Sequence, residues 1–460
     1  MKISFLGAAQ TVTGSMFLLE TPSGNLLVDC GLFQGRRQEA NERNRHLPEA
    51  ALRADAAVLT HAHIDHSGNL PTLVRSGFDG PIFTTPATAD LCQAMLRDAA
   101  SIQASDSEWL NRKFGDEPDW VPVEPLYTLE DVLKTLKHMV AYHYWRSFEP
   151  LPGVRVVFAD AGHVLGSASV LVDAGGSKIL FSGDIGRRGL PILRDPEVPA
   201  DADFLVMEST YGNRDHGPIE QSREELGRII KETAERGGKV IIPSFALERT
   251  QEVVYALKIL SEAGSLPAIP IYVDSPLAVN LTHVFRNHPE CYDKDLLAHI
   301  EAHGDPWGFE SVRYVRSVDE SRALNEAEGP MIIISASGMC EAGRIVHHLR
   351  NSIENPANTI VIVGFQAQHT LGRRISERRP EVKIFGVSRP LRARVEVLTG
   401  FSAHAGRKDL IDYARLAGPS LRQVFLVHGE PEAQAALADS LRTAQGLSVA
   451  VPKREETVTL

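Results

Sequence analysis

Short apolar runs closed by glycine or polar residues recur along residues 1–210. Their length and their content of Val, Ile, Leu and Phe predict β-strands. Helical periodicity interrupts them from about Thr88 to Trp109 and again over 129–139. The predicted strands are 2–7, 25–31, 56–61, 81–85, 154–161, 168–174, 178–184 and 204–209. This pattern indicates a sheet-rich α/β domain with polar residues at the strand ends.

From about Tyr211 the pattern changes to regular strand–helix alternation. Residues 222–238 have the periodicity of an amphipathic helix and end in glycine, and residues 239–245 form a buried strand directly afterwards. Strands separated by helices of this length indicate βαβ units and a parallel sheet. The same pattern continues over 248–264, 269–275, 331–337, 343–353, 358–365 and 370–377.

After about Phe385 the pattern of the first region returns, with strands predicted within 394–404 and 424–430 and a final helix over 432–444. We therefore expect a first domain formed by residues 1–210 and 386–460, with a second domain inserted at 211–385. A chain of 460 residues is long enough for two cores.

The composition is that of an ordinary globular protein, with 43% hydrophobic and 23% charged residues. A net charge of -11 gives no support to nucleic-acid binding by overall charge, although a local basic cluster can act against the total. The four cysteines are scattered, which argues against a disulfide framework or a zinc ribbon. The N-terminus predicts a strand rather than a signal peptide, and no apolar stretch approaches the roughly 20 residues that span a bilayer. We expect a cytoplasmic protein without membrane contact.

The segment 60–68, THAHIDHSG, places three histidines and an aspartate at the end of a predicted strand. His61 and His63 are one residue apart, so an extended strand end points both imidazoles the same way, as a zinc site requires. Asp65 and His66 follow where the chain turns and could bind a second ion. Any one of these histidines alone would more often be a surface or core residue, but the four residues together favour metal binding.

Further candidate ligands follow apolar strands elsewhere in the chain, namely His163, Asp184 and His428. An aspartate at the close of a strand is well suited to bridge two cations. Each carboxylate oxygen can bind one metal, and the negative charge offsets part of the repulsion between the ions.

These residues resemble the motifs of a known superfamily. Segment 60–68 matches the HxHxDH signature of the metallo-β-lactamase superfamily, and Asp29, His163 and Asp184 match its other motifs in order. The stretches VMESTYG, GFSAH and VHGE further resemble the β-CASP subfamily, which includes the endonuclease subunit of the eukaryotic cleavage and polyadenylation factor, its short bacterial and archaeal relatives, and ribonuclease J. The resemblance implies an αββα metallo-β-lactamase sandwich with an inserted parallel-sheet α/β (β-CASP) domain.

The resemblance also implies a ligand set for two zinc ions. One ion would be bound by His61, His63 and His163, the other by Asp65, His66 and His428, with Asp184 bridging. Manganese could replace zinc, because a site of histidines and carboxylates accepts both. Asp29 would orient a ligand or the adjacent loop, and a turn-capping role beside Gly31 is the alternative.

The implied activity is that of a zinc-dependent ribonuclease that hydrolyses phosphodiester bonds of single-stranded RNA. A metal-bridging hydroxide would be the nucleophile, and the metal ligands Asp65 and Asp184 would count among the catalytic residues. In the family, the acid that protonates the leaving 3′ oxygen corresponds to His404, paired with Glu208. Products would carry 3′-hydroxyl and 5′-phosphate ends. An endonuclease is favoured over a 5′-exonuclease, and the resemblance allows a homodimer, since such proteins commonly pair.

Two stretches that follow a strand are candidate phosphate-binding sites. The first lies between a strand and a helix, where free N–H groups and the helix dipole attract anions, and a plain tight turn is the alternative. The second contains a Gly-Arg pair that resembles the family's second-domain motif. Their residues are Ser335, Ser337, Gly338, Gly372 and Arg373. Between Leu371 and Arg394, eight basic residues stand against two glutamates, a cluster that could follow an RNA backbone. A solvated helix face is the ordinary interpretation of Arg378 and Arg379. No aromatic stacking array is evident near the cluster.

Two other functions are compatible with the same motifs. One is a small-molecule metallohydrolase acting on lactones, thioesters or phosphodiesters at the same dinuclear site, and the other is a non-catalytic RNA-processing scaffold. Ribonuclease Z and glyoxalase II share the first domain's ligands but lack the inserted domain and the SAH motif. The inserted domain would cover the metal site and leave a groove for a single strand, which favours RNA. Every ligand position is filled, which argues against a scaffold.

Overall fold

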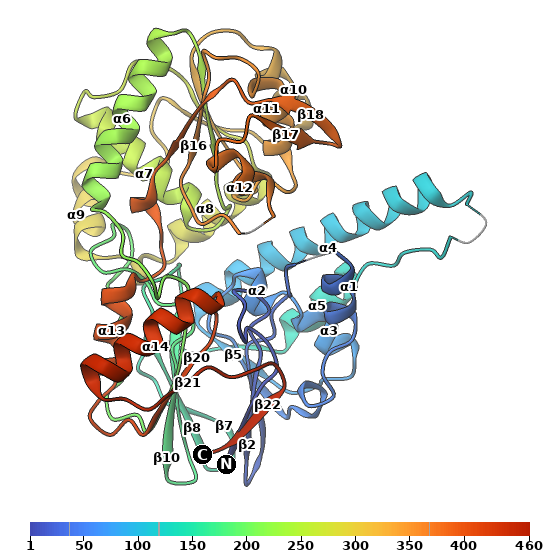
Figure 1. Ribbon diagram of the computed structural model, residues 1–460, viewed down its shortest axis with the longest axis vertical. Helices are drawn as coiled ribbons and strands as arrows, with labels where there is room; N and C mark the ends of the chain where they lie inside the picture. The colour runs from blue at the N-terminus through green and yellow to red at the C-terminus, as the bar shows by residue number, and fades with distance from the viewer. Residues whose placement is uncertain (36, 118–119, 368) are drawn as a thin grey trace. The chain divides into compact units, whose positions relative to one another are not determined.

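The computed structural model describes residues 1–35, 37–117, 120–367 and 369–460. These residues divide into two compact units (Figure 1). The first unit comprises Met1–Gly189, Asp195–Asp215 and His404–Leu460, and the second comprises Leu190–Arg194 and His216–Ala403.

Two seven-stranded sheets form the centre of the first unit. Their orders are β22-β1-β2-β3-β4-β5-β6 and β21-β20-β11-β10-β9-β8-β7. The strands of the first sheet are β1 (Lys2–Phe5), β2 (Phe17–Thr21), β3 (Gly24–Val28), β4 (Ala56–Val58), β5 (Ile82–Thr84), β6 (Met139–Ala141) and β22 (Glu456–Thr459). Those of the second are β7 (Phe148–Leu151), β8 (Val154–Asp160), β9 (Ala168–Ala174), β10 (Ser177–Phe181), β11 (Phe204–Met207), β20 (Gln423–Leu426) and β21 (Val449–Ala450).

The two sheets pack face to face over one apolar core, to which Phe5 and Phe158 contribute from opposite sheets. A second core, with Leu205 and Leu437, joins the other face of the second sheet to α13 and α14. The remaining helices of this unit lie on the side of the first sheet (Figure 1). The helices are α1 (Arg37–Arg45), α2 (Ile64–Ser67), α3 (Leu70–Arg75), α4 (Pro86–Phe114), α5 (Leu129–Lys137), α13 (Arg407–Leu416) and α14 (Pro431–Gln445). The predicted αββα sandwich is confirmed.

The second unit is built on a six-stranded sheet in the order β14-β13-β15-β12-β16-β19, and every pairing in it is parallel, as predicted. The strands are β12 (Lys239–Pro243), β13 (Ile271–Val273), β14 (Val312–Tyr314), β15 (Met331–Ser335), β16 (Thr359–Ile362) and β19 (Arg394–Val397). The helices are α6 (Ile219–Glu235), α7 (Arg249–Glu262), α8 (Pro276–Asn287), α9 (Lys294–His303), α10 (Val318–Glu326), α11 (Arg344–Ser352) and α12 (Leu371–Ser376). A separate antiparallel hairpin is formed by β17 (Glu381–Ile384) and β18 (Val387–Pro390).

The structure groups residues 386–403 with the second unit, whereas the sequence analysis assigns them to the returning part of the first domain. The reason is β19, which pairs in parallel with β16 and so continues the sheet of the second unit. A short strand pattern does not specify its partner, and this one joins the sheet that precedes it in the chain.

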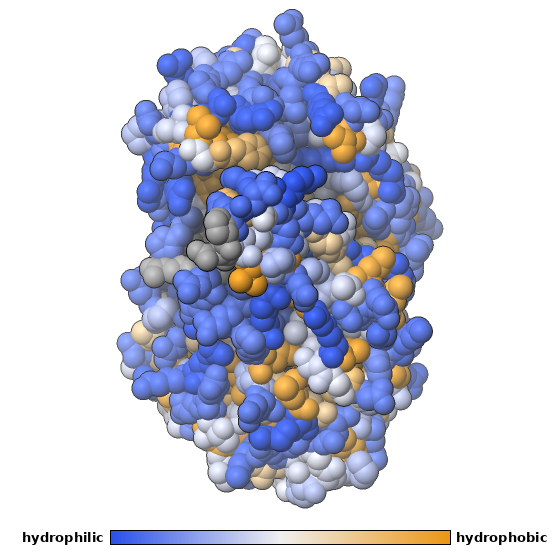
Figure 2. Space-filling view, turned by 90° about the vertical axis from the view of Figure 1, so that its right-hand side faces the viewer, coloured by the Kyte–Doolittle hydropathy of each residue, from blue (hydrophilic) through white to orange (hydrophobic). Residues whose placement is uncertain are grey.

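Hydrophobic side chains on the surface form small separate patches within a hydrophilic background on the face drawn in Figure 2. No described helix is long and apolar enough to cross a membrane.

Gly31 allows the loop after β3 to pass directly against the turn at α2. A Cβ built on Gly31 would lie 1.6 Å from the backbone oxygen of Asp65, and the Gly31 N–H donates to the Ser15 carbonyl at 2.9 Å. Only glycine therefore permits the close backbone approach that fixes the histidine-rich turn.

We expect Gly31→Ala to lower the free energy of unfolding by about 1–3 kcal/mol, because the added methyl group forces backbone apart in a packed region. Urea denaturation followed by circular dichroism measures this change. Gly217→Ala is the control, since a Cβ there meets no atom within 4 Å. Equal midpoints for the two variants would contradict the role of Gly31.

Candidate metal centre

Strands that run in the same direction bring the candidate residues to one edge of the second sheet. β10, β11 and β20 are parallel, and β8 has the direction of β10 because β9 lies antiparallel between them. Side chains that follow these strands therefore meet at one edge, together with the turn after β4 from the facing sheet. The residues concerned are His163 after β8, Asp184 after β10, Glu208 after β11 and His428 after β20.

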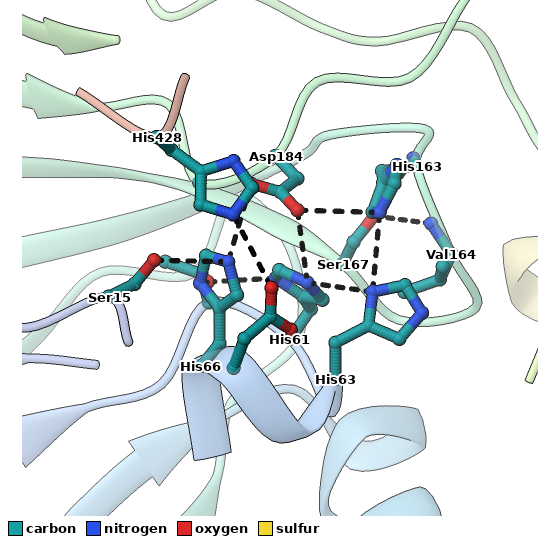
Figure 3. Close-up of polar contacts among 12 residues, drawn as sticks. Ser15, His61, His63, His66, His163, Val164, Ser167, Asp184 and His428 are labelled. Atoms are coloured by element: carbon teal, nitrogen blue, oxygen red, sulfur yellow. Dashed lines mark hydrogen bonds and ion pairs between the residues drawn. The ribbon is translucent and has the colours of Figure 1, made fainter. Parts of the chain in front are cut away.

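One group of converging nitrogen atoms consists of His61, His63 and His163 (Figure 3). His63 Nδ1 lies 3.2 Å from His61 Nε2 and 3.4 Å from His163 Nε2. His61 and His163 are fully or nearly fully buried. Three imidazole nitrogens this close, with burial disfavouring charge, form the kind of donor set that divalent metals bind.

The second group consists of Asp65, His66 and His428. His428 Nε2 lies 3.4 Å from Asp65 Oδ2. Asp65 and His66 lie on α2, directly after His63, while His428 follows β20, so this group joins the two sheets of the sandwich. It offers two nitrogens and a carboxylate oxygen, which also suit a divalent ion.

Asp184 lies between the two groups, and its two oxygens face different histidines (Figure 3). Oδ2 lies 3.6 Å from His61 Nε2 and 3.6 Å from His163 Nε2. Oδ1 lies 3.3 Å from His66 Nε2 and 3.4 Å from His428 Nδ1. This is the geometry that a bridging carboxylate needs.

Protonation of the His61, His63 and His163 group is compatible with metal binding. Burial lowers the pKa of His61 and His163, and lowers that of His63 to about 4, so these imidazoles are neutral at pH 7. Burial by itself would raise the pKa of Asp184, but His428 and His66 outweigh it and hold the pKa well below its usual range.

Two buried atoms of the centre lack a hydrogen-bond partner among the described residues, His163 Nδ1 and Asp184 Oδ1. An unsatisfied carboxylate oxygen at the meeting point of histidines is costly unless a cation lies there. The donor set therefore fits a divalent metal.

Asp29 lies behind His66 rather than among the converging atoms. Its Oδ2 is 2.7 Å from His66 Nδ1 and accepts from the Thr60 hydroxyl, while Oδ1 accepts from the Thr60 N–H at 2.8 Å. A carboxylate on the far nitrogen of an imidazole fixes its orientation and leaves Nε2 for a ligand. This geometry favours the orienting role of Asp29 over a simple turn cap.

Glu208 and His404 form a pair beside Asp184. Glu208 is fully buried, and its carboxylate accepts from the N–H groups of Ile185 and Thr210 at 2.7 and 3.2 Å. His404 Nδ1 lies 3.2 Å from Glu208 Oε1. Burial disfavours the imidazolium, but the Glu208 carboxylate outweighs it and raises the pKa of His404 to about 9.

The sequence analysis missed three hydroxyl residues that support the ligands. The Thr60 hydroxyl lies 3.0 Å from His61 Nδ1, Ser15 Oγ lies 3.2 Å from His66 Nε2, and Thr210 Oγ1 lies 3.2 Å from His428 Nδ1. Thr60 and Thr210 adjoin motifs in the sequence, which is a signal that could have identified them as supporting residues. Ser15 has no such signal, because it reaches His66 only through the folding of the loop before β2.

The two candidate phosphate-binding stretches meet at the carboxyl edge of the second unit's sheet. The Gly372 N–H donates to the Met339 carbonyl at 3.0 Å, and the Gly338 carbonyl accepts from Gln366 Nε2 at 3.0 Å. The Ser335 hydroxyl is buried and donates to the Asp274 carbonyl at 2.8 Å, so it is engaged within the sheet. Ser337 Oγ accepts from the Glu341 N–H at 3.2 Å.

Most of the basic cluster between Leu371 and Arg394 is paired with carboxylates. Arg373 and Arg379 both contact Glu377, and Arg394 contacts Glu232, a residue far away in the sequence. Arg378 and Arg389 have carboxylate partners as well. Three carboxylates outside the cluster, Glu232, Glu354 and Glu396, therefore offset part of the excess positive charge counted along the sequence.

Three protein families match successive parts of this chain. The metallo-beta-lactamase superfamily matches residues 10–138, the Beta-Casp domain matches 250–375, and the Zn-dependent metallo-hydrolase RNA specificity domain matches 388–452. The matched segments contain candidate ligands of the metal centre, such as His61 and His428.

Relatives similar over nearly the whole chain are known. Ribonuclease TTHA0252 of Thermus thermophilus is 39% identical over 443 residues, which cover 96% of either chain. Transcription termination factor FttA of Pyrococcus abyssi is 33% identical over 100% of this chain and 71% of its own length. The crystal structure of a protein of unknown function from Enterococcus faecalis V583 shares the fold, with a TM-score of 0.55 and 15% identity over 100% of this chain and 99% of its own. This chain belongs to the β-CASP family of the metallo-β-lactamase superfamily.

Proposed function

We propose that the protein is a zinc-dependent ribonuclease that hydrolyses phosphodiester bonds of single-stranded RNA. The observation that carries the proposal is Asp184, whose two oxygens face two separate groups of metal ligands beside the His404–Glu208 pair. The match to an RNA specificity domain and the similarity to a protein named ribonuclease support RNA as the substrate.

The ligand groups divide between two ions in this proposal. His61, His63 and His163 would hold one ion, and Asp65, His66 and His428 would hold the other, with Asp184 available to both. Bound divalent ions supply an acidified water molecule and polarise the phosphate. The chain's own contribution is a buried, preorganised donor set in which the histidines of the first group are neutral before any ion binds.

His404 is the proposed general acid for the leaving 3′ oxygen. Glu208 holds Nδ1 of the imidazole, which leaves Nε2 as the nitrogen that can deliver a proton. Glu208 is itself held by backbone N–H groups, so the pair keeps a fixed orientation. Departure of the 3′ oxygen yields 3′-hydroxyl and 5′-phosphate ends, and we propose internal cleavage rather than digestion from the 5′ end.

We expect purified protein with zinc to cut end-labelled single-stranded RNA into internal fragments, and chelation to abolish cutting until zinc is restored. His404→Ala should lose at least about 100-fold in cleavage rate, because general acid catalysis contributes on this scale, while its zinc content is unchanged. Asp184→Ala should lose both activity and zinc. Gel analysis of fragment sizes and end groups, with metal content by mass spectrometry, measures these outcomes.

His283→Ala is the matched control, since His283 is an exposed histidine on α8 of the second unit. Full activity in the His404 variant would remove its role as the acid. Intact RNA combined with rapid hydrolysis of a lactone or thioester would overturn the ribonuclease proposal and favour the small-molecule alternative.

Asp29→Asn should weaken zinc binding by about 10–100-fold at the His66 ion, because it removes the charge that orients His66. Competition with a chromophoric chelator measures the affinity directly, without reference to cleavage. Asp55→Asn is the control. It changes an exposed carboxylate that accepts a hydrogen bond from the Asn25 N–H, and it should leave both zinc affinities unaltered. Identical titrations for the two variants would assign Asp29 a structural role only.

A further inference from the structure

The turn of the β17–β18 hairpin contains a phenylalanine in an unfavourable backbone conformation. Ile384 pairs with Val387, so the turn consists of Phe385 and Gly386, and both have positive φ, at 50° and 81°. Two-residue turns of this kind favour Asn-Gly, and a bulky residue with positive φ is an outlier. Such residues concentrate at functional positions, which makes Phe385 a candidate contact site.

The Phe385 ring is held from one helix but remains open to solvent. His347 of α11 lies 4.8 Å away between ring centroids at 48°, and the Arg350 guanidinium lies 5.9 Å from the Phe385 centroid. Phe385 nevertheless keeps 56% of its surface exposed. The ring is therefore positioned by neighbours without being covered by them.

Arg350 beside this ring has no carboxylate partner among the described residues, unlike five arginines of the basic cluster. Among the described residues, no carboxylate lies within 4.0 Å of Arg350 or of Lys383, which precedes Phe385 by two positions on β17. Burial and then the Arg350 guanidinium lower the pKa of His347. The local field favours an anionic partner.

The exposed apolar surface here is too small for a protein partner. Phe385 and Val387 are the large apolar side chains that the hairpin exposes, and charged or polar residues surround them. A stable protein interface buries roughly 800 Å² on each partner with an apolar centre. One ring beside unpaired cations is instead the arrangement on which a nucleobase stacks while its phosphates meet positive charge.

We propose that the Phe385 hairpin is a base-stacking site for single-stranded RNA, with Arg350 and Lys383 contacting the phosphates that flank the stacked base. The proposal rests on the proposed ribonuclease function and adds a substrate contact that lies in the second unit, outside the metal centre. Stacking accepts any base, so the site holds the strand without selecting a sequence.

The test measures RNA affinity in an Asp184→Ala background, which prevents cleavage, with a fluorescent 12-nucleotide RNA and anisotropy. Phe385→Leu keeps an apolar side chain but loses the ring, and should weaken binding roughly 5- to 100-fold. Phe385→Trp should stay within about twofold of the parent, because it keeps the aromatic face. Val387→Ala, a change of an equally exposed residue in the same hairpin, is the matched control and should also stay within about twofold.

Two further measurements separate stacking from folding and from charge. Phe385→Asn suits the positive φ, so its thermal unfolding midpoint should equal or exceed that of the parent while its RNA affinity falls. Arg350→Ala should reduce the slope of log affinity against log salt by about one, whereas Phe385→Leu should leave that slope unchanged.

Equal affinity of the parent and Phe385→Leu for RNA would overturn the stacking site, and the ribonuclease proposal would stand if wild type still cuts RNA. Sedimentation without RNA tests a different role of the hairpin. If Phe385→Leu changes self-association but leaves RNA affinity unaltered, the hairpin is a contact between copies of this chain, and the stacking proposal is overturned. Wild-type protein that neither binds nor cuts RNA would overturn the ribonuclease proposal itself.

Discussion

The buried negative charge of Asp184, placed between two groups of histidines, is the interaction on which the metal centre depends. Five histidines converge at one edge of the sandwich, and Asp184 is the carboxylate that faces both ligand groups. It can do so because β8, β10, β11 and β20 share one direction and end at the same edge. In the proposed site, its buried negative charge would offset part of the repulsion between cations held by the two groups.

Backbone packing holds the ligands in place as much as side-chain contacts do. The loop after β3 passes so close to the Asp65 carbonyl that position 31 accepts no side chain, and the same loop carries Asp29 to His66. Glu208 is held in a comparable way by two N–H groups before it meets His404. These supports fix orientation in advance, which is what tight metal binding and directed proton transfer require.

Charge in the second unit is distributed differently from what its sequence suggests. Arginines that are adjacent along the chain find carboxylates from other elements, such as Glu232 of α6 and Glu354 beyond α11. Arg350 of α11, outside that cluster, lies near an exposed ring on a two-residue turn. A count of basic residues between Leu371 and Arg394 therefore overestimates how strongly this segment attracts a polyanion. The count also does not say which of these residues lack a carboxylate partner.

The sequence by itself indicated a sheet-rich α/β domain, the parallel sheet of the second unit and a histidine-rich metal site, and its resemblance to the family supplied the αββα sandwich and the His404–Glu208 pair. Long periodic segments and strand-end motifs carry that information locally. Tertiary structure alone decided that β19 joins the second unit, that short strands such as β6, β14 and the β17–β18 hairpin form at all, and that Ser15 meets His66. β6 and β14 are stabilised by pairing with β5 and β13, which lie tens of residues earlier in the chain. The contacts of charged and hydroxyl side chains depend on which backbones approach each other. For that physical reason the ligand types could be predicted from the sequence, whereas their supporting contacts and the exposed Phe385 ring could not.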